Sequence, residues 1–185
     1  MNDYLLIPII LVALAIIYLV FKSSRPAIVR AKPKTYAGPW ELIYSDAKDS
    51  NFKGESNLLV SKEYELTGKP DYIYRHRISG KIAVAELKSG SIADKQFPYR
   101  GDLLQLAAYF LLAREAYGKT PKEGRLIYAD RMFIVKNTKA LRRSVLTVMD
   151  EMREMLETGE GIPNTSFVGC KYCICKGTVC EHDDL

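Results

Sequence analysis

The sequence lacks internal repeats and low-complexity tracts, which excludes solenoid and fibrous architectures. Histidine is scarce, at two residues, and no cysteine occurs before residue 170. Acidic residues are in the minority, because 27 basic residues outnumber 22 acidic ones and give a formal net charge of +5. A mild basic excess of this kind suits a polyanionic partner.

Charged side chains are absent from Tyr4–Phe21, eighteen residues that are dense in Ile, Leu and Val. As a helix this segment would be about 27 Å long, enough to cross the hydrocarbon core of a bilayer. It has no polar face, unlike a helix that borders a soluble core, and no basic residue precedes it, unlike a secretory signal. Basic residues follow it, beginning with Lys22 and Arg25. We therefore expect a single-pass membrane anchor at residues 1–21 and a cytoplasmic C-terminal body.

Apolar periodicity is also missing from residues 22–39, which contain Ser-Ser-Arg-Pro, Ala-Lys-Pro-Lys and Gly-Pro. This composition is typical of a basic linker. The residues that follow are numerous enough for one domain with its own core. Without residues 1–21, whose one charged side chain is Asp3, the chain has 27 basic and 21 acidic residues, a formal charge of +6. We expect the domain at 40–160 and a separate cysteine-rich tail at 161–185.

The hydrophobic pattern predicts the order strands, helix, strands, helix. A helix is expected from Asp102, as its N-cap, to Tyr117, with its end at Gly118, and a long amphipathic helix should end near Gly159. Trp40–Ser45 fits either a strand or a helical turn. The other strands are expected at Leu58–Ser61, Glu65–Thr67, 71–76, 81–87, Arg125–Ala129 and Arg131–Val135. The economical packing is an α/β fold with a mixed central β-sheet flanked by helices.

Two carboxylates are expected to meet at one edge of this sheet. Side chains alternate along a strand, so Glu86 and Lys88 share one face of the strand at 81–87. A short hairpin would return the chain so that Asp71 lies next to Glu86. Converging carboxylates supply the oxygen ligands that Mg²⁺ or Mn²⁺ prefers. In the alternative interpretation, Glu86 and Lys88 form only a salt bridge at the end of the strand, and Asp71 is a turn residue.

The spacing of these residues resembles a known signature. Pro70-Asp71 is followed, after fourteen residues, by Glu86-Leu87-Lys88, and this pattern is similar to that of the PD-(D/E)XK nuclease superfamily. The resemblance implies a restriction-endonuclease-like core and a metal-dependent deoxyribonuclease activity. It also implies that Asp71 and Glu86 hold one or two divalent ions together with the carbonyl of Leu87. Lys88 would then position or deprotonate the attacking water.

A second motif narrows the resemblance. Gln105-Leu-Ala-Ala-Tyr109 is similar to the Q-x-x-x-Y helix motif of the RecB-like branch of the superfamily. Gln105 and Tyr109 are four residues apart and share a helix face, and the resemblance implies that they position the DNA strand and the catalytic groups. The alternative is a core tyrosine beside a surface glutamine. Tyr99 and Arg100, directly before the helix, are candidate phosphate contacts.

One element of the family pattern is not found in the sequence. Together with the C-terminal cysteines, the motifs resemble the CRISPR-associated Cas-four-type exonucleases over residues 58–180. Those enzymes supply a further metal ligand, often a histidine, from a helix upstream of the Pro-Asp motif. The candidates here are carboxylates, and none lies in a clear helix. His76 is on the wrong strand face, and His182 is close to the chain end. The early carboxylates are Asp46, Glu55 and Glu63.

All four cysteines lie within eleven residues, at Cys170, Cys173, Cys175 and Cys180. In a cytoplasmic chain, clustered cysteines are metal ligands more often than disulfide partners. Their C-x-x-C start resembles the cluster-binding cysteines of the family, which hold a four-iron four-sulfur cluster with one cysteine from near the N-terminus. Because no such cysteine exists here, we expect Cys175 as the fourth ligand. An iron–sulfur cluster is favoured over Zn²⁺, with free thiols as the third alternative.

These observations predict a membrane-anchored, divalent-metal-dependent DNA nuclease. We expect an exonuclease that acts on single-stranded ends, in DNA repair, DNA processing or CRISPR-type antiviral defence. Two other functions are compatible with the sequence. One is a catalytically inactive module that binds nucleic acid, and the other is a membrane-bound metal or redox adaptor whose cysteines are the functional part.

Overall fold

The structure is a computed structural model of the 185-residue chain, and it describes residues 11–14, 27–29, 36, 38–46, 57–93, 95–160 and 170. The chain divides into two compact units, residues 1–146 and 147–185. The predicted membrane anchor lies outside the described residues, except for a helical turn at 11–14. Within the described part of the chain, no helix has both the length and the apolar character needed to cross a membrane.

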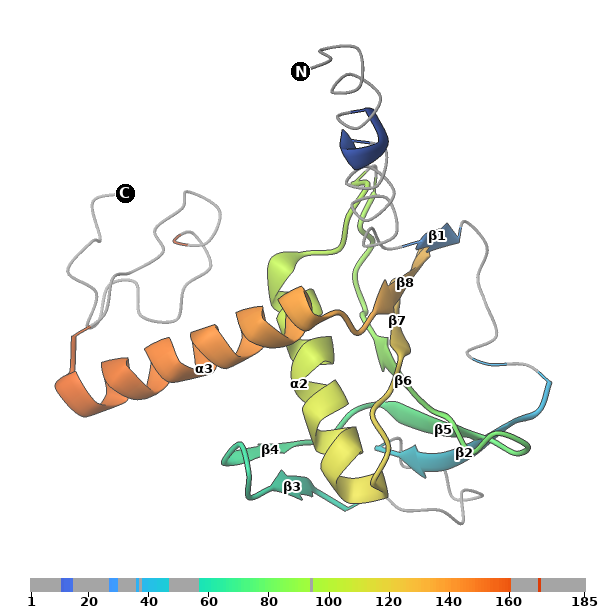
Figure 1. Cartoon of the computed structure of the whole chain (residues 1–185), viewed down its shortest axis with the longest axis horizontal. Coiled ribbons are helices and arrows are strands. Elements are labelled where there is room, and N and C mark those ends of the chain that lie inside the picture. The colour runs from blue at the N-terminus through green and yellow to red at the C-terminus, as the bar shows by residue number, and fades with distance from the viewer. Residues whose placement is uncertain are drawn as a thin grey trace, which may run out of the picture. The chain divides into compact units, whose positions relative to one another are not determined.

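The larger unit is built on a six-stranded mixed sheet with the strand order β1-β8-β7-β6-β5-β2 (Figure 1). Strands β6 and β7 are parallel, and the other neighbours in this sheet are antiparallel. A second, two-stranded sheet pairs β3 with β4. The bounds are β1 Ala27–Val29, β2 Trp40–Ser45, β3 Leu59–Ser61, β4 Leu66–Gly68, β5 Tyr72–His76, β6 Ile82–Leu87, β7 Glu123–Ile127 and β8 Met132–Lys136.

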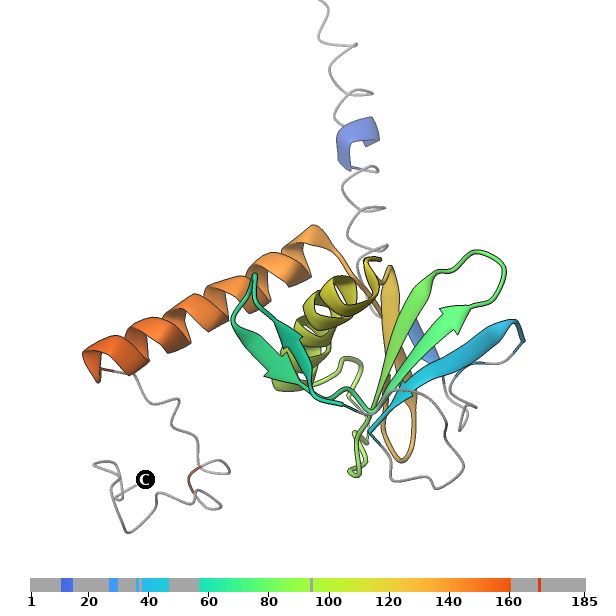
Figure 2. The same cartoon turned by 90° about the horizontal axis from the view of Figure 1, so that it is seen from below.

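Helix α2, Arg100–Tyr117, connects the parallel strands β6 and β7. It lies against one face of the sheet, with the β3–β4 hairpin beside it (Figure 2). The helix ends at Gly118, whose φ of 66° is the left-handed conformation that glycine adopts at helix C-termini. Its start differs from the prediction, because Tyr99 is the N-cap residue and Asp102 lies in the first turn. Asp102 does not cap the helix because its carboxylate binds Lys88 and Tyr128 instead.

The core has one cluster on each face of the sheet. The face covered by α2 buries Val84 of β6 against Leu106 and Phe110 of the helix. The opposite face buries Ala85 and Tyr74 with half-buried aromatic neighbours such as Trp40. The alternation predicted along β6 is therefore confirmed, and Glu86 lies on the face that α2 covers. Each fully buried large side chain contributes about 1.5–3 kcal/mol relative to exposure.

Close packing between α2 and the sheet depends on Gly124 of β7. A Cβ atom at this position would lie 2.7 Å from Cε1 of Phe110 and 2.9 Å from the carbonyl oxygen of Val84. Both distances are under 3.0 Å, which Cβ atoms essentially never show, so a side chain here would displace the Phe110 ring or the backbone of β6. Glycine at this position allows Phe110 of α2 to pack closely on β6 and β7.

Most predicted strands are confirmed within one or two residues, and Trp40–Ser45 is a strand. The predicted linker at 22–39 differs, because Ala27–Val29 forms β1 and pairs with β8 in the register Ala27↔Ile134 and Val29↔Met132. Its β-branched residues suit a strand, and the outer edge of β8 offers unpaired backbone groups. The partner strand is more than 100 residues away, so local composition gave no sign of the pairing.

Helix α3, Lys139–Thr158, ends before Gly159, as predicted. Its first turn is capped by Thr138, whose hydroxyl accepts a hydrogen bond from the backbone nitrogen of Leu141 at 3.1 Å. Leu141 packs against the core cluster of the larger unit. Only Val145 of this helix is buried among the described residues. The two compact units join in sequence within α3, between Leu146 and Thr147. The domain at 40–160 and the tail at 161–185 stay a prediction.

Candidate active site

Strand pairing brings Asp71 and Glu86 together. Strands β5 and β6 pair with Tyr72 opposite Ala85, so Asp71, which directly precedes β5, lies next to Glu86. The backbone nitrogen of Leu87 donates to Oδ2 of Asp71 at 2.6 Å, and the backbone nitrogen of Asp71 donates to Oε2 of Glu86 at 3.4 Å. Glu86 is 6% exposed and Asp71 is half-buried. The two carboxylates therefore converge at one sheet edge.

Helix α2 places Gln105 and Tyr109 directly over this pair. The Gln105 side-chain nitrogen, Nε2, donates to Oε1 of Glu86 and to the hydroxyl of Tyr109, both at 2.9 Å. The ring of Tyr109 lies against Gly68, where a Cβ would be 3.1 Å from its Cε1 atom. Gln105 and Tyr109 are both half-buried, and Gln105 contacts the carboxylate pair through Glu86.

The ammonium group of Lys88 lies among three side-chain acceptors. Its Nζ atom is 3.3 Å from Oε1 of Glu86 and 3.2 Å from Oδ1 of Asp102, and it donates to Oε1 of Gln105. The three charged side chains are between 7% and 21% exposed. The salt bridge between Glu86 and Lys88 is therefore present, but it is one contact within a larger network.

The network also includes two residues that the sequence did not single out as functional, Asp102 and Tyr128. The hydroxyl of Tyr128 donates to Oδ2 of Asp102. Tyr128 follows β7, and Lys88 follows the parallel strand β6, so both residues lie at the same edge of the sheet. One feature of the sequence could have pointed to Asp102. It lies three residues before Gln105, so the two side chains share a face of the helix.

The charges at this edge shift the pKa values of several groups. Burial raises the pKa of Glu86 to about 7, and the nearby Asp71 carboxylate adds to this rise against the opposing effect of Lys88. Burial by itself would lower the pKa of Lys88, but the carboxylates of Glu86 and Asp102 outweigh it and raise that pKa. The pKa of Tyr109 is raised, chiefly by burial. The Glu86–Asp71 pair thus carries a negative charge that a cation would stabilise.

The donor set of the pair fits Mg²⁺ or Mn²⁺. Magnesium in proteins is commonly bound through one or two carboxylates and keeps several waters for its remaining positions. Asp71 and Glu86 supply two carboxylates, and burial together with the neighbouring Asp71 carboxylate raises the pKa of Glu86 although the Lys88 ammonium group lies beside it. No cluster of three or more His, Cys, Asp or Glu side chains suited to a metal occurs among the described residues.

The early carboxylates do not join the pair. Asp46 forms an ion pair with Lys69 at 3.3 Å, and Glu63 lies 4.0 Å from Arg114. Glu55 lies outside the described residues. In the part of the chain that the structure describes, no upstream residue therefore completes a metal-binding group with Asp71 and Glu86.

Tyr99 and Arg100 lie beside the network and outside it. Tyr99 is 45% exposed, and its ring contacts that of Tyr128 with centroids 6.4 Å apart. The ammonium group of Lys95 lies 4.1 Å from the centroid of the Tyr99 ring. Arg100 is exposed at the start of α2. These side chains form a basic and aromatic surface, joined to the carboxylate cluster through Tyr128 and Asp102.

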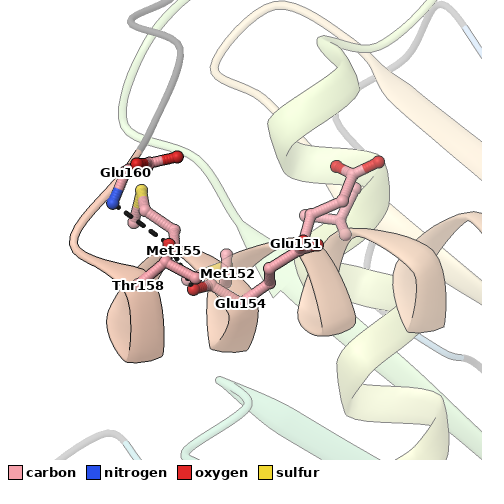
Figure 3. A pocket seen from close by; sticks show the side chains of 7 residues that line it. Glu151, Met152, Glu154, Met155, Thr158 and Glu160 are labelled. Carbon is pink, nitrogen blue, oxygen red and sulfur yellow. Dashed lines mark hydrogen bonds between the residues drawn. The ribbon is translucent and has the colours of Figure 1, made fainter.

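The other predicted metal site falls on residues that the structure does not describe. Of the four cysteines, only Cys170 is among the described residues. A hollow on the smaller unit runs along the C-terminal half of α3 (Figure 3) and includes none of the predicted site residues. Its lining residues are Val148, Glu151, Met152, Glu154, Met155, Thr158 and Glu160.

Comparison with known families agrees with the geometry. The family model of the PD-(D/E)XK nuclease superfamily matches residues 22–181. This range covers most of the chain, so the protein belongs to the PD-(D/E)XK nuclease superfamily. Nucleases of this superfamily usually use Mg²⁺ or Mn²⁺, and membership indicates a nuclease with DNA as its partner. No curated protein matches the sequence.

Proposed function

We propose that this protein is a divalent-metal-dependent DNA nuclease with Asp71, Glu86 and Lys88 as its catalytic residues. The observation that carries the proposal is the buried edge where Glu86 meets Asp71, Lys88 and Gln105. A buried carboxylate is costly without a task or a partner. In a member of this superfamily, the task that fits is holding a divalent cation next to a scissile phosphate.

Each residue has a defined part in the proposal. Asp71, Glu86 and the carbonyl of Leu87 hold Mg²⁺ or Mn²⁺. A cation at these residues would supply a more acidic bound water and would offset the charge that builds on the phosphate. Lys88 orients the attacking water and the phosphate oxygens. Gln105 holds the Glu86 carboxylate in its rotamer through the 2.9 Å hydrogen bond, and Tyr109 holds Gln105 in turn.

The exposed residues just before and at the start of α2 favour single-stranded DNA as the substrate. Phe97 and Tyr99 are 49% and 45% exposed, and Lys95 and Arg100 supply positive charge on either side of them. Exposed rings stack on unpaired bases, and basic side chains bind phosphates. We propose that a single-stranded end is bound here and cut exonucleolytically. This proposal includes a RecB-like, Cas-four-type role in DNA repair, DNA processing or antiviral defence.

The proposal extends to both ends of the chain. The uncharged run at Tyr4–Phe21 and the basic residues after it support a single-pass anchor with the nuclease on the cytoplasmic side of the membrane. The clustered cysteines support an iron–sulfur cluster in the tail at 161–185, with Zn²⁺ as the alternative. Absorbance near 400 nm and metal analysis of the purified protein distinguish iron from zinc. Extraction of isolated membranes at alkaline pH tests the anchor, because a membrane-spanning protein stays in the pellet.

The nuclease proposal is tested on end-labelled single-stranded and duplex DNA. The full-length protein should release labelled products with Mg²⁺ or Mn²⁺ and none with EDTA. Glu86→Ala should abolish cleavage, whereas Asp150→Asn, which changes an exposed acid on α3, should leave it unchanged. Equal cleavage by wild type and Glu86→Ala, after purification free of contaminating nucleases, would refute the assignment.

A second function is favoured by one observation: among the described residues, no third His, Cys, Asp or Glu joins Asp71 and Glu86 in a group that could hold a metal ion. A protein that keeps the fold but binds its metal too weakly would act as a nucleic-acid-binding module. The same experiment separates the two functions. Salt-dependent binding of DNA without metal-dependent cleavage indicates the binding module.

A further inference from the structure

The contacts of Lys88 give a role to a residue outside the signature motifs. A lysine ammonium group has three N–H donors and no acceptor. Here Nζ has three acceptors, which belong to Glu86, Gln105 and Asp102. The first two are motif residues of the proposed nuclease centre, but Asp102 is not. Its carboxylate is therefore a third support for the lysine, and it comes from a different turn of α2.

Asp102 differs from the other two acceptors in what else it contacts. Glu86 is a proposed ligand of the cation, and Gln105 holds the Glu86 carboxylate through Nε2. A cation held by Glu86 would compete with Lys88 for the oxygens of that carboxylate. Asp102 is not a proposed ligand of the cation. Its second oxygen, Oδ2, accepts a hydrogen bond from the hydroxyl of Tyr128. Asp102 is therefore the acceptor that would keep Lys88 in place when Glu86 holds a cation.

Tyr128 makes this support rigid. Its side chain is 5% exposed, and its ring packs edge-on against Phe133 with centroids 5.8 Å apart and an interplanar angle of 86°. The backbone nitrogen of Tyr128 donates to the carbonyl of Arg131 at 2.8 Å. The phenol is thus fixed in the core, and its hydroxyl sets the orientation of the Asp102 carboxylate toward Nζ of Lys88.

We propose that Asp102, held by Tyr128, is the positioning residue for Lys88 and keeps its ammonium group beside the carboxylates of Asp71 and Glu86. This inference deepens the proposed function and rests on it. A simpler role for Asp102 is that of an acid in the first turn of a helix, where it stabilises the helix dipole. That role predicts a change in stability alone and no connection with Lys88.

Kinetics on single-stranded DNA separate the two roles. Asp102→Asn should lower kcat by about tenfold to a hundredfold, because a displaced catalytic group slows the reaction, and should leave KM nearly unchanged. Asp102→Glu should recover part of the rate. The same Asn substitution should have no effect in the Lys88→Ala background, because residues that act as a unit are not additive. Independent, multiplying effects of the two substitutions would overturn the proposal.

A second measurement needs neither metal nor DNA. Side-chain ¹⁵N NMR of lysine-labelled protein detects ammonium groups that exchange slowly with water. The Lys88 signal, identified by its loss in Lys88→Ala, should be present in wild type and lost in Asp102→Asn, with Tyr128→Phe intermediate. Asp150→Asn is the control, because this acid binds Arg153 on an exposed surface. Matching backbone amide spectra show that each variant is folded.

The two measurements give distinct outcomes. If wild type does not cleave DNA but Asp102→Asn releases Lys88 in the NMR spectrum, the nuclease proposal fails and the positioning role stands. If wild type cleaves DNA and the Lys88 signal is the same in Asp102→Asn, the positioning role fails and the nuclease proposal stands.

Discussion

Carboxylates gather in two regions of this protein, at the end of β6 and along the C-terminal half of α3. At β6, Glu86 is 6% exposed, and its carboxylate accepts hydrogen bonds from Lys88 and Gln105. On α3, Asp150 has a side chain that is 75% exposed, and its contact is with Arg153 one turn away, at 3.0 Å. Glu151, Glu154 and Glu160 line the hollow of Figure 3 from the same segment.

The difference between these regions teaches that burial, more than the number of acids, prepares a carboxylate for chemistry. At β6, removal from water raises the pKa of Glu86, because the charged carboxylate is less stable there. A bound cation would stabilise that charge strongly. On α3, water and salt screen the charges, and a surface ion pair contributes little. The α3 segment has more carboxylates, but all of them are exposed.

The largest expected effect follows from removing one carboxylate from each region. Asp71→Asn should lower the rate of metal-dependent DNA cleavage roughly a thousandfold or more, as removal of a catalytic group does in other hydrolases. Glu154→Gln should leave the rate within about twofold of wild type, because this residue does not touch the centre. Initial rates on end-labelled DNA measure both. Comparable losses in the two variants would remove the contrast between the regions.

The next effect is a dependence of stability on pH in metal-free protein. Glu86 has a folded pKa of about 7, against 4.5 as its ordinary value, so the folded state holds more protons between these values. The free energy of unfolding contributed by Glu86 therefore falls as pH rises from about 4.5 to 7, by at most about 3 kcal/mol.

This pH effect is isolated by comparison with Glu86→Gln, which stays neutral. Denaturant unfolding with EDTA present should show that Glu86→Gln gains stability relative to wild type between pH 5 and pH 8. Glu154→Gln, on the exposed segment, should show the same difference from wild type at both pH values. A gain by Glu86→Gln that does not change with pH would contradict the burial argument.

A smaller effect tests the packing that places α2 over the carboxylates. Gly124→Ala should destabilise the protein by about 1–3 kcal/mol, because the new Cβ would overlap Phe110 and the backbone of Val84. Gly90→Ala is the matched control, since a Cβ there meets nothing within 4 Å. Chemical denaturation measures both free energies. Equal stability of the two variants would mean that α2 packs less closely than the structure indicates.

The smallest effect is expected on α3. Arg153→Ala removes the ion pair with Asp150 and should change the free energy of unfolding by less than about 1 kcal/mol. The change should shrink further in 1 M salt, because exposed charges are screened. A loss of several kcal/mol would show that this helix surface is more organised than its exposure suggests.

The sequence predicted those features of the fold that neighbouring residues determine, such as strand alternation and helix ends. The alternation of residues 82–87 defined β6 and the face of Glu86, and Gly118 and Gly159 marked the ends of α2 and α3. Strand β1 was not predicted, because a three-residue strand exists only through its pairing with β8. The identity of its neighbour is not encoded in its own composition.

The candidate site also contains residues that the sequence predicted and one whose role it did not reveal. Asp71, Glu86, Lys88, Gln105 and Tyr109 carry spacings that a family signature makes visible, and the structure brings all of them into one network. Asp102 was interpreted only as an N-cap. Its contacts reach back to Lys88 and forward to Tyr128, 26 residues away. Such a role is visible only after folding has brought three separate segments to one edge.

The most direct test of the account is the binding of Mn²⁺ in the absence of DNA, followed by electron paramagnetic resonance. Wild type should bind Mn²⁺ saturably, and both Asp71→Asn and Glu86→Gln should weaken this binding about tenfold or more, while Glu154→Gln binds as wild type does. Binding that is unchanged in both Asp71→Asn and Glu86→Gln would show that the two carboxylates at the end of β6 do not hold the metal.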